Sequence, residues 1–364
     1  MATSQGTWGY RDRFGDAFAR TYFRRFGPGV ASSIGLGTYL GAPTDEYDER
    51  YRESVTDALS AGINHVDTAI NYRHQRSERV VGEALDAADA GREEVVVATK
   101  GGFVPFDGSR PDDPGAYVRE EFVRPGHVAV DDLARGSHAI APDFLDELLD
   151  RSLANLGVDT VDCYYVHNPE TQLAVRNREA VYEQLEAAFE RLERRREAGD
   201  IGAYGVATWE AFRVPRDHDA YLSLPEVVDR AARAAEKVGA AEPGLKAIQL
   251  PFSVTMADAF TVAAHRLPEE ERDVSALEYA QAAGLDVVAS ATLAQGDLAS
   301  SIPAAVDAEL HGETAAQRAI NFARSAPGVT TALVGTSSPG HVPENVAAGT
   351  FEPLGARAFD AVFE

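Results

Sequence analysis

The stretch GINHVDTAINYRHQRSERVVGEAL, residues 62–85, places an acidic residue and a tyrosine between a strand pattern and a helix pattern. The apolar run at 63–67 predicts a strand that ends in Asp67, and the segment 76–89 predicts an amphipathic helix. The loop between them carries Tyr72. A strand, a loop and a helix in this order form the unit from which parallel α/β folds are built.

The same unit recurs along the chain. The predicted strands are 33–38, 63–67, 94–99, 161–166, 202–207, 246–250, 285–291 and 329–334. The predicted helices lie near 48–61, 76–89, 142–156, 178–198, 223–239, 273–283, 313–325 and 340–348. Eight strand–helix units predict an α/β fold of the (β/α)8 TIM barrel type, with a doubly wound open sheet as the alternative. No linker-like stretch divides the chain, so we expect a single domain over residues 1–364, with 1–30 as an N-terminal extension.

One segment, residues 103–140, interrupts this regular order. It is rich in Pro, Gly and Asp, and it follows the third predicted strand. Long irregular segments are unusual in compact folds and are often functional. Because the active sites of TIM barrels lie at the carboxyl ends of the strands, we predict an insertion loop over the barrel mouth. A disordered or oligomer-contacting loop is the alternative. The candidate pocket residues in this prediction are Tyr117, Phe122, His138 and, after the fifth strand, Trp209.

The composition limits the partners and the location. The net charge of −24 argues against nucleic acids and anionic membranes as partners, because both are bound by basic surfaces. Only three of the 34 basic residues are lysine, which is typical of an acidic, halophilic-like surface, although GC-rich coding would also favour arginine. The single cysteine, Cys163, excludes an intrachain disulfide, and residues 1–18 lack the pattern of a signal peptide. We therefore expect a cytoplasmic protein.

The common cofactor and metal motifs do not occur in the sequence. The run GLGTYLG at 35–41 departs from the dinucleotide pattern G-x-G-x-x-G at Leu40, and a turn is the simpler interpretation. There is no G-x-x-x-x-G-K-[ST] phosphate loop and no H-E-x-x-H pair, so we predict no metal site.

Four polar residues follow consecutive predicted strands at the end where a barrel keeps its active site. Asp67 and Tyr72 follow the second strand, Lys100 the third and His167 the fourth. Each has a structural alternative: a helix cap for Asp67, a packed aromatic for Tyr72, a solvated end for Lys100, and a hydrogen-bonded loop histidine for His167. Their common placement favours a shared site.

The chemistry of these four groups is complementary. A tyrosine hydroxyl has a pKa near 10, and a neighbouring ammonium lowers that value. A carboxylate keeps the ammonium charged, and a neutral imidazole can orient a carbonyl oxygen by a hydrogen bond. Together such groups polarise a carbonyl and protonate it, so the hydride must come from a cofactor.

The sequence resembles the aldo-keto reductases over residues 33–348. The resemblance rests on G-INHVDTAINYRHQR-SERVVGEAL, on VVVATKGG around Lys100, on DCYYVHNPE around His167, and on PGVTTALVGTSSPGHVPENV at 327–346. It implies that Tyr72 is the general acid/base, that Lys100 tunes it, that Asp67 pairs with Lys100, and that His167 orients the substrate. It also implies a nicotinamide cofactor bound at the barrel mouth without a Rossmann fold.

The resemblance also implies cofactor contacts, with departures from the family pattern. The candidate cofactor-binding residues are Thr208, Gln249, Phe252, Thr292, Leu293, Ser337, Ser338, His341, Glu344 and Asn345. The usual Ser-Asn pair that holds the carboxamide is Ala207-Thr208 here, and Phe252 replaces the stacking tyrosine. Gly335 and His341 stand where many members place Lys and Arg on the 2′-phosphate. We therefore expect NADP(H), with NAD(H) not excluded.

The expected function is interconversion of a small aldehyde, ketone or sugar with the alcohol. The alternative is a nicotinamide-binding regulatory or redox-sensing subunit with little turnover. A barrel hydrolase or lyase that uses Asp67 and His167 is a third candidate. The sequence does not predict the substrate, the direction or the oligomeric state.

Overall fold

Eight parallel strands close into a barrel in the order β3-β4-β5-β6-β7-β8-β11-β12. The computed structural model describes residues 1–267 and 270–363. The barrel strands are β3 (Ile34–Gly37), β4 (His65–Asp67), β5 (Val96–Gly101), β6 (Val161–His167), β7 (Ile201–Ala207), β8 (Leu245–Pro251), β11 (Asp286–Ser290) and β12 (Val329–Gly335). Each coincides with a predicted strand, which confirms the TIM barrel and excludes the open sheet.

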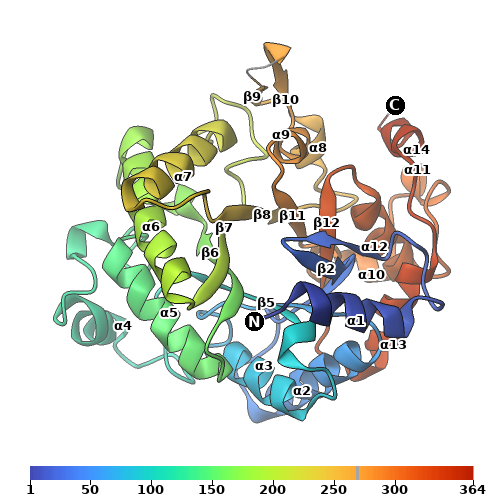
Figure 1. The fold of residues 1–364 in the computed structure, drawn as a ribbon, viewed down its shortest axis with the longest axis horizontal. Helices are drawn as coiled ribbons and strands as arrows, with labels where there is room; N and C mark the ends of the chain where they lie inside the picture. Colours follow the sequence, from blue (N-terminus) through green and yellow to red (C-terminus); the bar gives the residue numbers. More distant parts are fainter. Residues whose placement is uncertain (268–269, 364) are drawn as a thin grey trace.

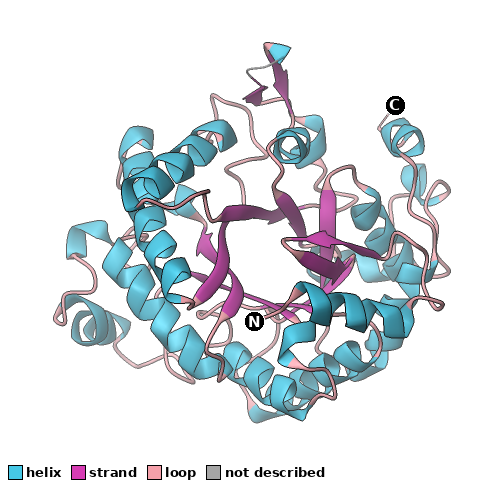
Figure 2. Cartoon of the chain, in the orientation of Figure 1, coloured by secondary structure: helices cyan, strands magenta, loops and turns pink. Residues whose placement is uncertain are grey.

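A helix follows each barrel strand, and the helices form a ring around the strands (Figures 1 and 2). They are α2 (Asp45–Ser60), α3 (Arg76–Ala87), α5 (Pro142–Leu156), α6 (Arg178–Ala198), α7 (Leu224–Val238), α9 (Ala276–Ala282), α12 (Ala315–Ser325) and α13 (Val342–Ala347). Shorter elements are α8 (Asp258–Thr261), α10 (Asp297–Ser300), α11 (Ala304–Asp307), α14 (Ala356–Ala361), β9 (His265–Leu267) and β10 (Arg272–Val274).

Local sequence explains where these helices begin, end and face the barrel. The Ser223 side chain caps the first turn of α7, and Gly239, with φ of 77°, ends it in the left-handed conformation that glycine adopts without strain. In α6, Val181, Leu185 and Phe189 are fully buried, as their spacing along one helix face predicts.

The N-terminal residues cover the amino end of the barrel. Helix α1 (Ser4–Phe14) precedes the antiparallel hairpin of β1 (Phe23–Phe26) and β2 (Gly29–Ser32). The buried Tyr10 hydroxyl donates to the carbonyl of Leu59, and the Phe26 ring packs 5.2 Å from the ring of His65, at the start of β4. The carboxyl end of the barrel therefore stays accessible.

The insertion at 103–140 is more ordered than its composition predicts. It contains helix α4 (Pro114–Val118), a π-helical turn (Arg119–Val123) and a 3-10 turn (Val130–Asp132). Figure 1 shows α4 at the periphery beside α5. The fully buried Phe122 packs with its ring 5.4 Å from that of Phe144 in α5, and the two rings belong to one apolar cluster that the insertion shares with α5. The insertion thus packs on α5, and Phe103 at its start lines the mouth.

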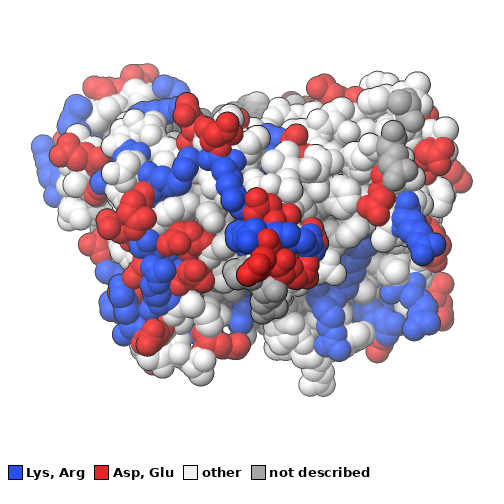
Figure 3. Space-filling view, turned by 90° about the horizontal axis from the view of Figure 1, so that it is seen from above, with Lys and Arg blue, Asp and Glu red and all other residues white. Residues whose placement is uncertain are grey.

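Arginine-rich ion pairs connect the outer helices. Arg191 on α6 binds Asp146 on α5 at 2.7 Å, and Arg230 on α7 binds Glu179 on α6 at 2.6 Å. Figure 3 shows acidic and basic side chains side by side over one face. Pairing neutralises part of the charge, while the acidic excess of the whole chain remains.

Candidate active site

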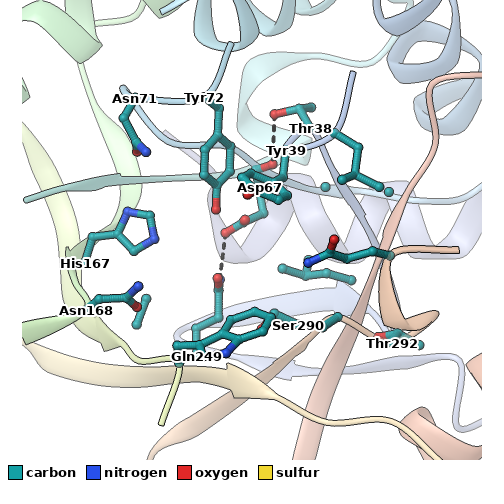
Figure 4. A pocket seen from close by; sticks show the side chains of 18 of the residues that line it. Thr38, Tyr39, Asp67, Asn71, Tyr72, His167, Asn168, Gln249, Ser290 and Thr292 are labelled. Atoms are coloured by element: carbon teal, nitrogen blue, oxygen red, sulfur yellow. Dashed lines mark hydrogen bonds between the residues drawn. The ribbon is translucent and has the colours of Figure 1, made fainter. Parts of the chain in front are cut away.

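Asp67 and Lys100 form a buried ion pair at the carboxyl ends of β4 and β5. The Lys100 Nζ donates to Asp67 Oδ1 at 2.5 Å and to the Thr68 carbonyl at 2.8 Å. The second carboxylate oxygen of Asp67 accepts from Gln249 Nε2 at 2.8 Å, and Gln249 reaches it from β8 (Figure 4). Parallel pairing of β4 with β5 sets these residues at one end of the barrel.

Tyr72 lies on a short loop that the backbone holds in place. The amide of Ile70 donates to the carbonyl of Lys100 at 3.3 Å, so the loop is attached to β5. After Tyr72, three successive residues, 73–75, adopt positive φ angles before α3 begins. The Tyr72 ring centroid lies 4.9 Å from Lys100 Nζ and 6.0 Å from the imidazole of His167, the last residue of β6. The four residues are therefore brought together, as their strand positions predict.

Burial sets the protonation of these groups. Burial alone lowers the pKa of Lys100, but Asp67 and Tyr72 outweigh it, so the pKa of Lys100 is raised above its ordinary value. Burial lowers the pKa of His167 well below its ordinary value, and the charge of Lys100 adds to this effect. Lysine is thus charged and histidine neutral near pH 7.

The pKa of Tyr72 differs from the expectation. Lys100 lowers it, as the sequence predicts, but burial is the larger effect, and the net result is a pKa above the ordinary value of 10.0. The sequence reveals the neighbouring charge but not the depth of burial, and desolvation disfavours the phenolate.

A cavity of about 500 Å³ opens above these residues at the barrel mouth. Asp67, Tyr72 and His167 line it, and Figure 4 shows the Tyr72 hydroxyl and the His167 ring in it. Lys100 is fully buried behind them. The site can therefore present a hydroxyl and a neutral imidazole to one small molecule.

The candidate cofactor residues divide into three groups. Those that line the cavity are Thr208, Gln249, Thr292 and Leu293, and Trp209 lines it as well. Those that follow β12, outside the cavity lining, are Ser337, Ser338, His341, Glu344 and Asn345. Phe252 alone faces the core: it is fully buried, and its ring stacks 5.6 Å from that of Phe322. Phe252 therefore does not line the cavity, so it is not placed to stack on a nicotinamide there as the sequence predicts.

The three pocket candidates in the insertion also lie elsewhere. Phe122 belongs to the insertion's apolar cluster, Tyr117 borders a separate pocket beside α5, and His138 is fully buried. Instead, Phe103 at the start of the insertion lines the cavity. The sequence does not predict that Phe103 lines the cavity in place of the three candidates, because this depends on how the insertion packs against the barrel.

Several residues that line the cavity were not predicted from the sequence. Thr38 and Tyr39 follow β3, Asn71 precedes Tyr72, and Asn168 follows His167. The available signal was position, since each lies at a strand end beside a residue already singled out. The exposed Tyr39 also packs its ring 5.0 Å from that of Tyr72, so it forms part of the wall.

The cavity has features that fit a nicotinamide cofactor. The Thr208 hydroxyl is buried and has no hydrogen-bond partner among residues 1–267 and 270–363, so it is available to an amide. The loop after β11 carries positive φ angles at Ala291, Ala294 and Gln295. Loops of alternating backbone hand form amide nests that bind anions such as a pyrophosphate.

The described part of the chain has neither a membrane-spanning helix nor a metal-binding cluster. Within residues 1–267 and 270–363, no helix has the length and apolarity needed to cross a bilayer. Across the same residues, no three His, Cys, Asp or Glu side chains are grouped so that they could hold a metal ion.

Comparison with known proteins gives consistent similarities. The model of the Aldo/keto reductase family matches residues 33–363. A 6-dehydroglucose reductase of Novosphingobium aromaticivorans is 32% identical over 156 residues, which are 41% of this chain and 42% of that protein. A putative voltage-gated potassium channel subunit beta of Schizosaccharomyces pombe is 26% identical over 188 residues, 51% of this chain and 44% of that protein. The matches thus span less than half the length of either relative.

A solved structure resembles the whole fold. The aldo/keto reductase of Klebsiella pneumoniae in complex with NADP and acetate superposes with a TM-score of 0.60 at 20% identity, covering 94% of both chains. At this identity the likeness concerns the fold.

Proposed function

The chain belongs to the aldo/keto reductase family, and from this premise we propose that it interconverts a small aldehyde or ketone and the alcohol with a nicotinamide cofactor. One observation carries the proposal: Tyr72, the Asp67–Lys100 ion pair and His167 meet at the floor of one cavity. The proposed substrates are small-molecule carbonyls, including sugars, and the proposed location is cytoplasmic.

Tyr72 is the general acid of the proposed reduction. Its hydroxyl donates a proton to the carbonyl oxygen, and the charged Lys100 stabilises the phenolate that remains. The raised pKa of Tyr72, caused by burial, favours the protonated form that reduction requires. A bound nicotinamide supplies the hydride.

His167 and Asp67 have supporting roles in the proposal. His167 is neutral because burial lowers its pKa, so it can donate a hydrogen bond to the carbonyl oxygen without protonating it. Asp67 holds Lys100 in place, and Gln249 holds Asp67. The reacting oxygen would therefore meet two donors, the Tyr72 hydroxyl from the loop after β4 and the His167 imidazole from the end of β6.

NADP(H) is the proposed cofactor, and NAD(H) is the alternative. Thr208 would hold the carboxamide, and the loop at 291–296 would bind the pyrophosphate. The NADP bound to the Klebsiella pneumoniae relative of the same fold supports NADP(H). The segment 336–346, near the proposed adenosine end, contains neither lysine nor arginine, which supports the alternative. Separate fluorescence titrations with NADPH and NADH distinguish the two.

Tyr72→Phe tests the proposal. A general acid typically contributes ~10²–10⁴ in rate, so we expect kcat to fall by about that factor. NADPH affinity should stay near wild type, because the ring is retained. Wild-type turnover in the variant would contradict the role of Tyr72.

A regulatory or redox-sensing subunit is the second candidate, favoured by the similarity to the putative channel subunit beta. This candidate predicts tight NADPH binding with little oxidation across a panel such as 4-nitrobenzaldehyde, methylglyoxal and aldoses. Rapid NADPH oxidation with any member of the panel supports the reductase.

A further inference from the structure

We propose that His138, in the insertion after β5, is a positioning residue that holds the backbone of His167 and so orients its imidazole toward the substrate carbonyl. This inference rests on the proposed function, and it adds a residue from outside the four-residue cluster.

The two ends of the insertion pair with each other directly after β5. The amide of Val104 donates to the carbonyl of Ser137 at 2.8 Å, and the amide of Ala139 donates to that of Gly102 at 2.9 Å. This short antiparallel pairing places the side chain of His138 against the end of β6. The insertion therefore contacts the end of β6 through a hydrogen-bonded segment that includes His138.

The His138 ring forms a hydrogen bond to the main chain of His167. Its Nε2 lies 2.7 Å from the His167 carbonyl oxygen, and both groups are buried. A carbonyl at the end of a strand has no further ladder partner on that side, so a buried one needs a donor from elsewhere. His138 supplies this donor.

Gln172 determines which nitrogen of His138 carries the proton. Its Nε2 lies 2.9 Å from His138 Nδ1 and 2.8 Å from the His138 carbonyl oxygen. Only the amide nitrogen can face that carbonyl, so Nδ1 is the acceptor and the proton resides on Nε2. Burial lowers the pKa of His138 to about 4, which keeps the ring neutral near pH 7. Gln172 and burial thus keep His138 in the neutral form that donates from Nε2 to the His167 carbonyl oxygen.

Packing supports the same contact. The Phe103 ring lies 4.7 Å from the ring of His138 and 5.1 Å from that of His167, edge on to both. Gly102 permits the approach, since a Cβ there would lie 2.8 Å from the His167 carbonyl oxygen. The insertion therefore contacts both the backbone of His167, through His138, and its ring, through Phe103.

His138→Ala tests the proposal, with His138→Gln as the conservative variant. A glutamine Nε2 can occupy the place of the ring Nε2 and donate to the same carbonyl. Because displacement by ~1 Å can reduce catalysis about 100-fold, we expect kcat/KM of His138→Ala to fall ~10–100-fold with 4-nitrobenzaldehyde or the best carbonyl of the panel. NADPH affinity should change less than about twofold, and His138→Gln should recover most of the activity.

His265 offers a matched control. It is fully buried, and its Nε2 lies 2.8 Å from the Phe212 carbonyl oxygen, outside the cavity lining. His265→Ala should lower the melting temperature and leave kcat/KM near wild type. Equal losses in the His138 and His265 variants would overturn the proposal, and so would wild-type kcat/KM in His138→Ala.

A second readout does not depend on turnover. In ¹⁵N-histidine NMR spectra, we expect one Nε2–H tautomer for His138 and a change in the His167 ring signals in His138→Gln and His138→Ala, larger in the alanine variant. Unchanged His167 signals in both variants would refute the positioning role. Inactive wild-type protein would instead refute the proposed function, while these signals would still decide the role of His138.

Discussion

Replacing Lys100 by methionine should expose the electrostatics of the barrel mouth. Lys100 is fully buried, and it is the cation that faces the buried Asp67 carboxylate. Methionine keeps the length and apolar character of the side chain but leaves this carboxylate, among the residues that the structure describes, with the hydrogen bond from Gln249 as its one side-chain contact. Breaking one partner of a buried ion pair destabilises a protein by ~3–5 kcal/mol.

The size of the expected shift follows from the length of the chain. The unfolding entropy of 364 residues is about 0.8 kcal/mol/K, so the loss corresponds to a decrease of about 4–7 °C in melting temperature.

Burial raises the pKa of Asp67 even with Lys100 present, and without the lysine this pKa should rise further. An acid whose folded-state pKa exceeds the unfolded value of ~3.9 stabilises the fold at low pH and loses this contribution as pH rises. The variant should therefore differ more from wild type at pH 8 than at pH 5.

Differential scanning calorimetry at both pH values provides the measurement, and Lys100→Met/Asp67→Asn provides the control. The double variant removes both charges, so it should regain most of the lost stability while remaining inactive. A double variant no more stable than Lys100→Met, or a loss independent of pH, would refute the reasoning.

Three further predictions concern the cofactor, the core and the surface. Thr208→Val removes a buried hydroxyl that has no partner within the described residues, and it should weaken NADPH binding about 3–10-fold by fluorescence titration, whereas unchanged affinity would exclude Thr208 as a contact. His65 is fully buried with its pKa lowered to about 3. Its neutral form therefore contributes its full stabilisation above the unfolded-state pKa of ~6.5, and this contribution is lost as the pH falls below that value. Between pH 7 and pH 5, the free energy of unfolding measured with urea should fall by ~2 kcal/mol less in His65→Leu than in wild type. An equal decrease in both proteins would contradict this. Because the net charge is −24, raising KCl from about 0.1 to 1 M, which shortens the screening length from ~10 to ~3 Å, should raise the melting temperature; a decrease would mean that ion pairs outweigh the self-repulsion.

The sequence by itself determined the architecture and the four-residue cluster. Strand and helix patterns are local, because the period of apolar residues reports which face is buried. Once eight strands are known to be parallel and closed, their carboxyl ends must meet, so the approximate place of Asp67, Lys100 and His167 followed without coordinates. Within the architecture, the structure was required for the N-terminal helix and hairpin, for the short elements of the insertion and for the exact ends of the other elements.

The tertiary structure alone decided the roles that depend on burial and on contacts distant in sequence. Burial reversed the expected direction of the Tyr72 pKa, since desolvation depends on everything packed around a group. Phe252 is buried in the core, and Phe122 and His138 of the insertion lie outside the cavity lining. Phe103 lines the cavity instead. The bond from His138 to the His167 carbonyl joins residues 29 positions apart through a loop that has no periodic pattern, and no local rule predicts such a contact.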